Sequence, residues 1–318
     1  MAGNRFENYS GSQLSVQLRH NVERLWQVLQ GIRPPKQYVN VEGGGIEQQH
    51  DWRLRLHHCA NYAAALTILK QENRSLRLLE LGCGTGVLSY GLARIMPAEW
   101  SLMATDYSRY LIEYARQQYS TPNLVFDCLD VNDISASALK EFDAVLMLEL
   151  IEHLNCWETR ELLHRLGAGL KPASLVVIST PDRSAFPRDH SGYYPHKIEY
   201  RYSTLFRFLS GLQNNPFRSF ELYQIVAPGI VRAAVRAERR GGYLLNRFAG
   251  LVERLSSHQV HFHRYQRRVL SWLSRIFWRL TGGGQKCDIT RLLDDFQLTG
   301  TDTGDHQLSF SLIAVLRK

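Results

Sequence analysis

Two carboxylates and an imidazole lie close together in the segment Glu149-Leu-Ile-Glu152-His153. Side chains three and four residues apart lie on the same side of a helical turn, so these three groups can converge. A second imidazole, His196, occurs in the segment Pro-His-Lys-Ile-Glu-Tyr. Carboxylate and imidazole ligands together suit magnesium, manganese, iron or zinc. The pattern therefore predicts a divalent-metal site formed by Glu149, Glu152, His153 and His196.

A metal-free active site is the alternative for the same residues. A hydroxyl group that reacts as a nucleophile must lose its proton, and its pKa is high. A bound divalent cation can lower that pKa, or an imidazole can accept the proton directly. We therefore expect Glu152, His153 and His196 to be catalytic, with His153 as the general base if no metal binds. His153 could also only cap the next helix, and His196 only hold its loop. Three nearby side chains could line the pocket instead: His190, Tyr193 and Tyr194.

An apolar run near residue 80 ends in three alternating glycines, Gly82, Gly84 and Gly86. The run has the length of a buried parallel strand, and a helical pattern follows it. A strand, a glycine-rich turn and a helix form the nucleotide-binding turn of a doubly wound sheet, where side chains would keep a ligand from the backbone. Asp106 lies about twenty residues later, where an acidic residue can accept both hydroxyls of an adenosine ribose. The expected ligand therefore contains adenosine.

Strand and helix patterns alternate along the chain from residue 76 onward. The predicted strands are 76–81, 100–105, 123–128, 142–148 and 174–180, and the predicted helices are 86–96, 108–119, 135–140 and 157–170. A helix at 203–212 and strands at 217–226 and 309–316 follow. The alternation predicts an α/β fold with a doubly wound, Rossmann-like sheet and helices on both faces. Parallel strands end at one edge of a sheet, so residues after the fourth and fifth strands can face the ligand.

The heptapeptide Glu-Leu-Gly-Cys-Gly-Thr-Gly resembles the glycine motif of the class I S-adenosylmethionine (SAM)-dependent methyltransferases, whereas dehydrogenases place the third glycine one residue later. The resemblance covers residues 75–228 and the last strand. It implies that Asp130 takes the adenine amino group and that Val131 stacks on the ring, with Asp127 and Asp133 as competitors for the first role. The residues expected to bind SAM are Glu80, Gly82, Cys83, Gly84, Gly86, Asp106, Tyr107, Asp130, Val131 and Leu148.

Two methyltransferase subfamilies carry a motif similar to Glu-x-x-Glu-His with a later histidine. The small-RNA 3′-terminal ribose 2′-O-methyltransferases use two glutamates and two histidines to bind a divalent metal. Ile198 and Tyr200 replace the aromatic pair that follows the later histidine in that family. The ubiquinone-biosynthesis O-methyltransferases carry a similar motif and sit on membranes. The resemblance implies O-methylation of a small or lipid-like molecule, with RNA ribose methylation as the alternative.

A non-catalytic SAM-binding or NAD-binding module is the alternative from a different class of protein. Glu80, Gly86 and the acidic pair Asp106 and Asp130 argue against NAD, and the polar cluster at 149–153 argues against a loss of catalysis. We therefore expect an enzyme.

Four regions follow from these patterns. They are an N-terminal helical cap at 1–70, a SAM-binding core at 71–228, a basic helical insertion at 229–306 and the last strand of the core at 307–318. The cap should contain helices at 14–30 and about 51–70. These helices either cover the cofactor or substrate, or only pack on the sheet.

The net charge of +8 is concentrated in the insertion. Residues 231–280 contain eleven arginines, no lysine and two acidic residues, which sum to +9. Within this segment, 264–280 combines an apolar stripe with arginines on another side of a predicted helix. The apolar stripe consists of Leu270, Leu273, Phe277 and Leu280, and the arginines are Arg268, Arg275 and Arg279. Such a helix lies on an anionic membrane surface, packs on its own domain with solvated arginines, or contacts phosphates of RNA.

The five cysteines are scattered, with no Cys-x-x-Cys pair, which fits a reducing compartment. The N-terminal residues lack the apolar run of a signal peptide, and no apolar stretch reaches the roughly 18 residues of a membrane span. We therefore expect a cytoplasmic protein that can associate with a membrane surface.

Overall fold

The structure is a computed structural model. It describes residues 11–32, 52–193, 195–212, 216–243, 247, 292–300 and 308–318. The predicted basic helix at 264–280 lies outside these residues. No helix in the described ranges is both long and apolar enough to cross a membrane.

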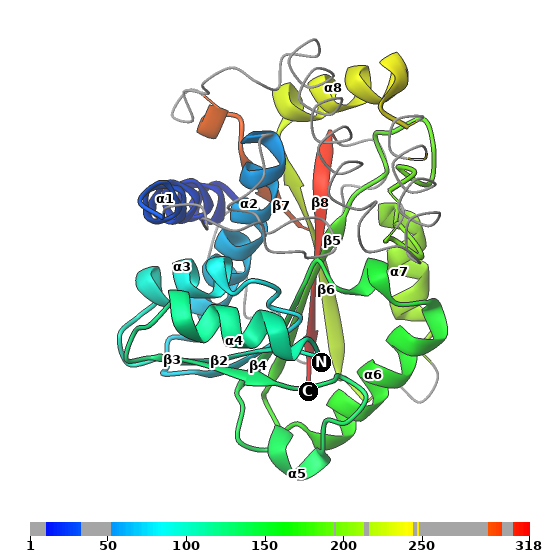
Figure 1. Ribbon diagram of the computed structural model, residues 1–318. Coiled ribbons are helices and arrows are strands. Elements are labelled where there is room, and N and C mark those ends of the chain that lie inside the picture. The colour runs from blue at the N-terminus through cyan, green and yellow to red at the C-terminus, as the bar shows by residue number, and fades with distance from the viewer. Residues whose placement is uncertain are drawn as a thin grey trace, which may run out of the picture.

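The centre of the fold is an eight-stranded sheet with the order β3-β2-β1-β4-β5-β8-β6-β7 (Figure 1). The strands are β1 (Arg77–Leu81), β2 (Ser101–Asp106), β3 (Leu124–Cys128), β4 (Ala144–Leu148), β5 (Leu175–Pro181), β6 (Ser219–Val226), β7 (Gln297–Thr299) and β8 (Ser309–Arg317). The first five pair in parallel, and β8 pairs antiparallel with β5 and β6. The strand order reverses between β1 and β4, where doubly wound sheets bind ligands. The predicted α/β fold is confirmed.

Helices cover both faces of the sheet, because successive side chains of a strand point to opposite faces. Leu78 lies in one apolar core and Leu79 in the other. Figure 1 shows α1, α2 and α3 on one side and α5, α6 and α7 on the other. The helices of the core are α3 (Val87–Ile95), α4 (Arg109–Gln118), α5 (Ala136–Leu139), α6 (Cys156–Gly169) and α7 (Tyr202–Ser210).

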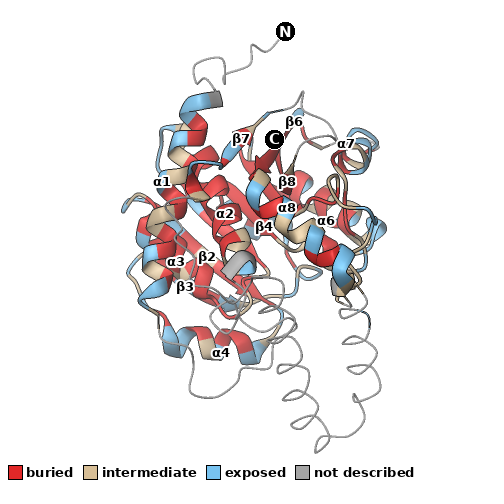
Figure 2. Cartoon of the chain, turned by 90° about the horizontal axis from the view of Figure 1, so that it is seen from above, coloured by how far each residue is buried: buried red, intermediate tan, exposed pale blue. Residues whose placement is uncertain are grey.

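The N-terminal helices α1 (Gly11–Gln30) and α2 (Trp52–Leu69) are part of the core. Helix α1 buries one face, with Leu18, Val22 and Leu25 fully covered, and leaves the opposite face exposed (Figure 2). Helix α2 is alanine-rich and buried on most of its sides, so it lies between α1 and the sheet. Both helices therefore pack on the sheet, and α2 also brings polar side chains to the candidate active site described below.

Strand β7 is an element that sequence analysis did not predict. It lies within 229–306 and pairs with the end of β6. Helix α1 is bound to this region, since Arg19 Nη1 donates to Phe296 O (3.1 Å) and Leu298 N donates to Ser15 Oγ (3.1 Å). A three-residue edge strand carries too short a pattern to be recognised from periodicity.

The segment between β6 and β8 leaves and re-enters the sheet at one edge. Val226, the last residue of β6, pairs with Ser309, and Ser311 pairs with Pro181 at the carboxyl end of β5. Helix α8 (Pro228–Ala237) starts there and continues into a π-helical turn, Glu238–Gly242. The basic segment therefore begins at the edge where the parallel strands end.

We predict that α1 contributes to the cooperative stability of the fold. Leu25 is fully buried and packs so closely on α3 that a methyl group on Gly91 would lie 2.5 Å from its Cδ1. Leu25→Ala should lower the free energy of unfolding by roughly 2–5 kcal/mol, measured by urea denaturation. Val16→Ala, on the exposed face, should change it by less than about 0.5 kcal/mol. Equal small effects would show that α1 is not part of the cooperative unit.

Candidate active site

The turn between β1 and α3 is shaped by its glycines. Gly82, Gly84 and Gly86 have φ values of 81°, 57° and 76°, the left-handed region that side chains disfavour. A methyl group on Gly86 would lie 2.5 Å from Phe126 Cε1, so glycine is required there for packing. A methyl group on Gly84 would meet no atom within 4 Å. The backbone at Gly84 is therefore open to a ligand, as the sequence predicts.

Asp106 lies at the carboxyl end of β2, beside this turn. Its buried carboxylate accepts hydrogen bonds from Gly84 N at 3.0 Å and from Ser108 N at 2.9 Å. These bonds fix the carboxylate at the edge of the glycine turn. This is the position expected for binding the ribose hydroxyls.

Glu80 is buried one residue before the turn, and the Tyr62 hydroxyl from α2 donates to Oε1. Burial raises the pKa of Glu80 to about 7. Its Oε2 atom is also buried and has no hydrogen-bond partner in the described part of the chain. An incompletely paired buried carboxylate favours a positively charged neighbour. SAM carries a sulfonium and an ammonium group, so these residues fit this cofactor.

The remaining predicted SAM-binding residues surround the same edge. Leu129 N donates to Asp106 O (3.0 Å), which places the segment after β3 next to the glycine turn. Asp130 is exposed there, while its competitor Asp127 pairs with Arg116 at 3.0 Å. Cys83 and Leu148 are buried, Tyr107 is exposed, and Val131 is half-buried. The assignment of adenine to Asp130 and Val131 stays a prediction.

Glu149 follows β4 with a left-handed backbone, at φ 57°. His57 Nε2 on α2 donates to its Oε2 at 2.6 Å, while Asn61 Nδ2 and Ser179 Oγ donate to Oε1 at 2.9 and 3.0 Å. Burial alone would raise the pKa of Glu149, but the nearby imidazoles outweigh burial and lower it to about 2. Glu149 is therefore a buried carboxylate that is already paired.

Glu152, His153 and His196 form a separate group, in which one ligand atom from each residue lies within 4.8 Å of the others. Glu149 is outside this group of three. His153 Nδ1 lies 3.2 Å from Pro195 O, and His196 Nδ1 lies 2.6 Å from Glu199 Oε1. A carbonyl or a carboxylate only accepts, so both Nδ1 atoms carry the proton. When the imidazole is neutral, the lone pair therefore lies on Nε2, where it can bind a metal or accept a proton.

The charge states of this group favour a bound cation. Burial and the nearby His196 lower the pKa of His153, so its imidazole is neutral. Burial and the charge of Glu149 raise the pKa of Glu152 well above its usual range. The Glu152 carboxyl accepts from Thr180 Oγ1 at 3.0 Å. Two imidazoles and a carboxylate are a donor set that divalent ions accept, and a bound ion would take the place of the proton on Glu152.

Residues 78–173 match a protein-family model described as a methyltransferase domain. The chain contains a class I SAM-dependent methyltransferase domain. A malonyl-[acyl-carrier protein] O-methyltransferase of Bacillus cereus is 27% identical over 42% of this chain and 49% of its own length. A ubiquinone biosynthesis O-methyltransferase of Bradyrhizobium diazoefficiens is 33% identical over 34% of this chain and 41% of its own length. The chain thus matches these two curated relatives over less than half of their length.

Among solved structures, a phosphoethanolamine N-methyltransferase 2 of Haemonchus contortus with bound S-adenosyl-L-methionine is 13% identical. The alignment covers 94% of this chain and 57% of that chain, with a TM-score of 0.46.

The candidate active site also contains residues that the sequence analysis did not predict. His57 and Asn61 lie on α2, far from the glycine motif in sequence, and reach the site only because α2 packs on the sheet. Glu199 accepts a hydrogen bond from His196, three residues before it. Its position in the Pro-His-Lys-Ile-Glu-Tyr segment is the sequence feature that could have predicted this role. The loop residue His190 accepts from Gly192 N (2.9 Å) and donates to His196 O (3.0 Å), so it holds the loop.

Tyr193 packs edge-on against the His196 ring, with 4.8 Å between the ring centroids. It therefore supports the ligand-binding loop beside the candidate active site. Tyr194, predicted as another lining residue, lies outside the described residues.

We predict that Asp106→Ala weakens SAM binding at least about tenfold. Charge-assisted hydrogen bonds to the ribose hydroxyls contribute roughly 1.5–3 kcal/mol each. Titration calorimetry with SAM measures the affinity, and thermal melting shows whether the variant is folded. Asp127→Ala is the matched control, since Asp127 is exposed and pairs with Arg116, and it should bind SAM like the wild type. A folded Asp106→Ala variant with unchanged affinity would remove Asp106 from the cofactor site.

Proposed function

We propose that this methyltransferase transfers the methyl group of SAM to a hydroxyl oxygen of a small or lipid-like molecule. The observation that supports this most directly is the group formed by Glu152, His153 and His196, in which hydrogen bonds hold the Nδ1 atoms of both histidines. It follows β4 and β5, at the same sheet edge as the glycine turn. The two relatives named above are both O-methyltransferases.

The chemistry of methyl transfer explains why such a group is needed. The sulfonium methyl is already activated, so the protein must align the acceptor and allow its proton to leave. The new bond joins the methyl carbon to the acceptor oxygen, the carbon–sulfur bond breaks, and S-adenosylhomocysteine is released. Glu152, His153 and His196 would hold a divalent ion, which lowers the pKa of a hydroxyl bound to it. Without an ion, His153 Nε2 is the acceptor for that proton.

The described start of the basic segment supports an acceptor that carries negative charge or lies at an anionic surface. Helix α8 and the turn that follows expose four arginines: Arg232, Arg236, Arg239 and Arg240. Their acidic neighbour Glu238 is buried, so it does not offset this charge at the surface. The arginines lie beside the sheet edge that carries the candidate active site.

We predict that catalysis needs a divalent ion. Activity on a methyl acceptor should be lost with excess chelator and restored by a divalent ion. His196→Ala should have the same effect as the chelator while SAM affinity stays within about twofold, because the glycine turn is formed by other residues. His20→Ala, an exposed histidine on α1, is the matched control and should remain fully active. Full activity in excess chelator would contradict the metal and leave His153 as the general base.

The class of acceptor is tested by incubating the purified protein with cell extract and SAM labelled in its methyl group. Mass spectrometry of the fractions should find the label in a small or lipid-like molecule. The linkage should resist mild alkali, because a methyl ether does and a methyl ester does not. Label in RNA would support ribose methylation instead. An alkali-labile label would show that the acceptor is a carboxyl group.

A further inference from the structure

Arg183 joins two buried carboxylates that come from different parts of the chain. Its Nη2 atom lies 2.6 Å from Glu238 Oε2, and its Nε atom lies 3.3 Å from Glu199 Oε2. The guanidinium also donates to Arg188 O and lies over the Phe186 ring, 4.1 Å from its centroid. All three charged side chains are less than a tenth exposed. Arg183 is therefore fixed in one orientation by contacts on every side.

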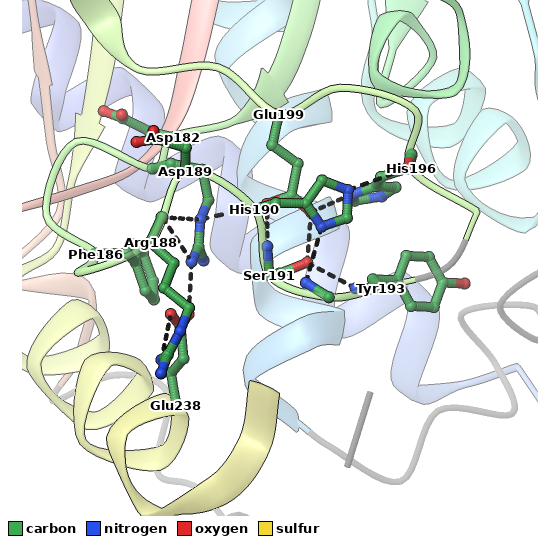
Figure 3. A network of polar contacts seen from close by, with 12 residues as sticks. Asp182, Phe186, Arg188, Asp189, His190, Ser191, Tyr193, His196, Glu199 and Glu238 are labelled. Carbon is green, nitrogen blue, oxygen red and sulfur yellow. Dashed lines mark hydrogen bonds and ion pairs between the residues drawn. The ribbon is translucent and has the colours of Figure 1, made fainter. Parts of the chain in front are cut away.

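Glu199 connects this ion pair to the candidate active site. Its Oε1 atom accepts from His196 Nδ1 at 2.6 Å, and its Oε2 atom accepts from Ser191 N at 2.7 Å (Figure 3). The Ser191 hydroxyl donates to Oε1. A carboxylate that accepts from the Nδ1–H of a histidine fixes the tautomer and the ring orientation, and so aims Nε2. The position of Glu199 thus sets the position of the His196 lone pair.

Glu238 connects the same ion pair to the basic segment. It is the first residue of the π-helical turn after α8, in which Gly241 has φ 112°. Two further contacts join this segment to the loop after β5. Arg188 lies 4.4 Å from the centroid of the Tyr243 ring, and a methyl group on Gly192 would lie 3.0 Å from Tyr243 O. The described start of the basic segment, up to Tyr243, is therefore packed on the loop that carries His196.

We propose that Glu238 is a positioning residue for His196, acting through Arg183 and Glu199. The way in which the start of the basic segment packs on the loop then sets how strongly Glu152, His153 and His196 bind a metal ion. This inference rests on the proposed function for the role of His196. The guanidinium presents its donors in a rigid fork, so a shift of Glu238 moves Arg183 and, with it, Glu199. Removing one partner of a buried ion pair leaves an uncompensated charge. The neighbouring groups then shift to compensate for that charge.

The first test is the affinity for Co²⁺, measured by calorimetry on the full chain without any methyl acceptor. Loss of a partner behind a metal-binding histidine typically weakens metal binding about 10–100-fold. Glu199→Gln should fall within this range, and Glu238→Gln should weaken binding about tenfold. SAM affinity should stay unchanged in both variants. Arg77→Gln is the matched control, because the exposed Arg77 pairs with the exposed Glu141 at the start of β1, the end of the strand opposite the glycine turn. It should bind Co²⁺ within about twofold of the wild type.

The second test measures the tautomer of the His196 imidazole directly, by NMR of protein labelled in its histidine rings. In the wild type, His196 should be the Nδ1–H tautomer. Glu238→Gln should shift its ring nitrogen signals, and Arg77→Gln should not. If Glu238→Gln does not fold, Arg183→Lys replaces it, since one ammonium group cannot span both carboxylates. Arg183→Lys should reproduce the weaker Co²⁺ binding and the altered ring signals.

The outcomes distinguish a failure of the proposed function from a failure of the coupling between Glu238 and His196 through Arg183 and Glu199, which we call the relay. Wild-type protein that binds no Co²⁺ contradicts the metal role of His196, and the NMR comparison then decides the relay alone. A folded Glu238→Gln or Arg183→Lys variant with wild-type Co²⁺ affinity and ring signals overturns the relay and leaves Arg183 as a structural ion pair. Weaker binding with shifted signals, at unchanged SAM affinity, supports it.

Discussion

The parallel pairing of β4 with β5 determines where the candidate catalytic groups lie. Leu148 pairs with Ser179, so the residues that follow each strand meet at one edge. Glu149 N then donates to Ser179 O at 3.1 Å, and Thr180 Oγ1 donates to Glu152 at 3.0 Å. The pairing of β1 with β2 brings the glycine turn to the same edge beside Asp106. The candidate cofactor site and the candidate catalytic groups are therefore neighbours because of strand register.

Three buried carboxylates around this edge have different partners. Glu149 pairs with His57, and Glu199 pairs with Arg183 and His196. Glu152 accepts from Thr180, and its pKa is raised instead of lowered. A buried carboxylate without a cation is costly unless it is protonated or a cation arrives. This contrast explains why Glu152, and not Glu149, belongs with the two histidines in the group that can bind an ion.

The segments outside the core also meet at this edge. Because β6 and β8 run antiparallel to each other, the segment between them leaves and returns where β5 ends. Helix α2 covers the sheet nearby and supplies His57 and Tyr62. Two polar contacts thus link these segments to the candidate active site. One joins α2 to Glu149, and the other joins Glu238 to Arg183.

The sequence by itself determined the order of strands and helices, the glycine turn with Asp106, and the Glu152, His153 and His196 candidates. These features depend on local periodicity and spacing, which the chain carries whatever its tertiary fold. Only the tertiary structure separated Glu149 from that group, because its left-handed backbone and the packing of α2 turn its carboxylate toward His57. It also showed β7 and the contacts of Glu238. Glu238 contacts Arg183, which lies 55 positions earlier in the chain, and no local pattern records a contact between residues so far apart.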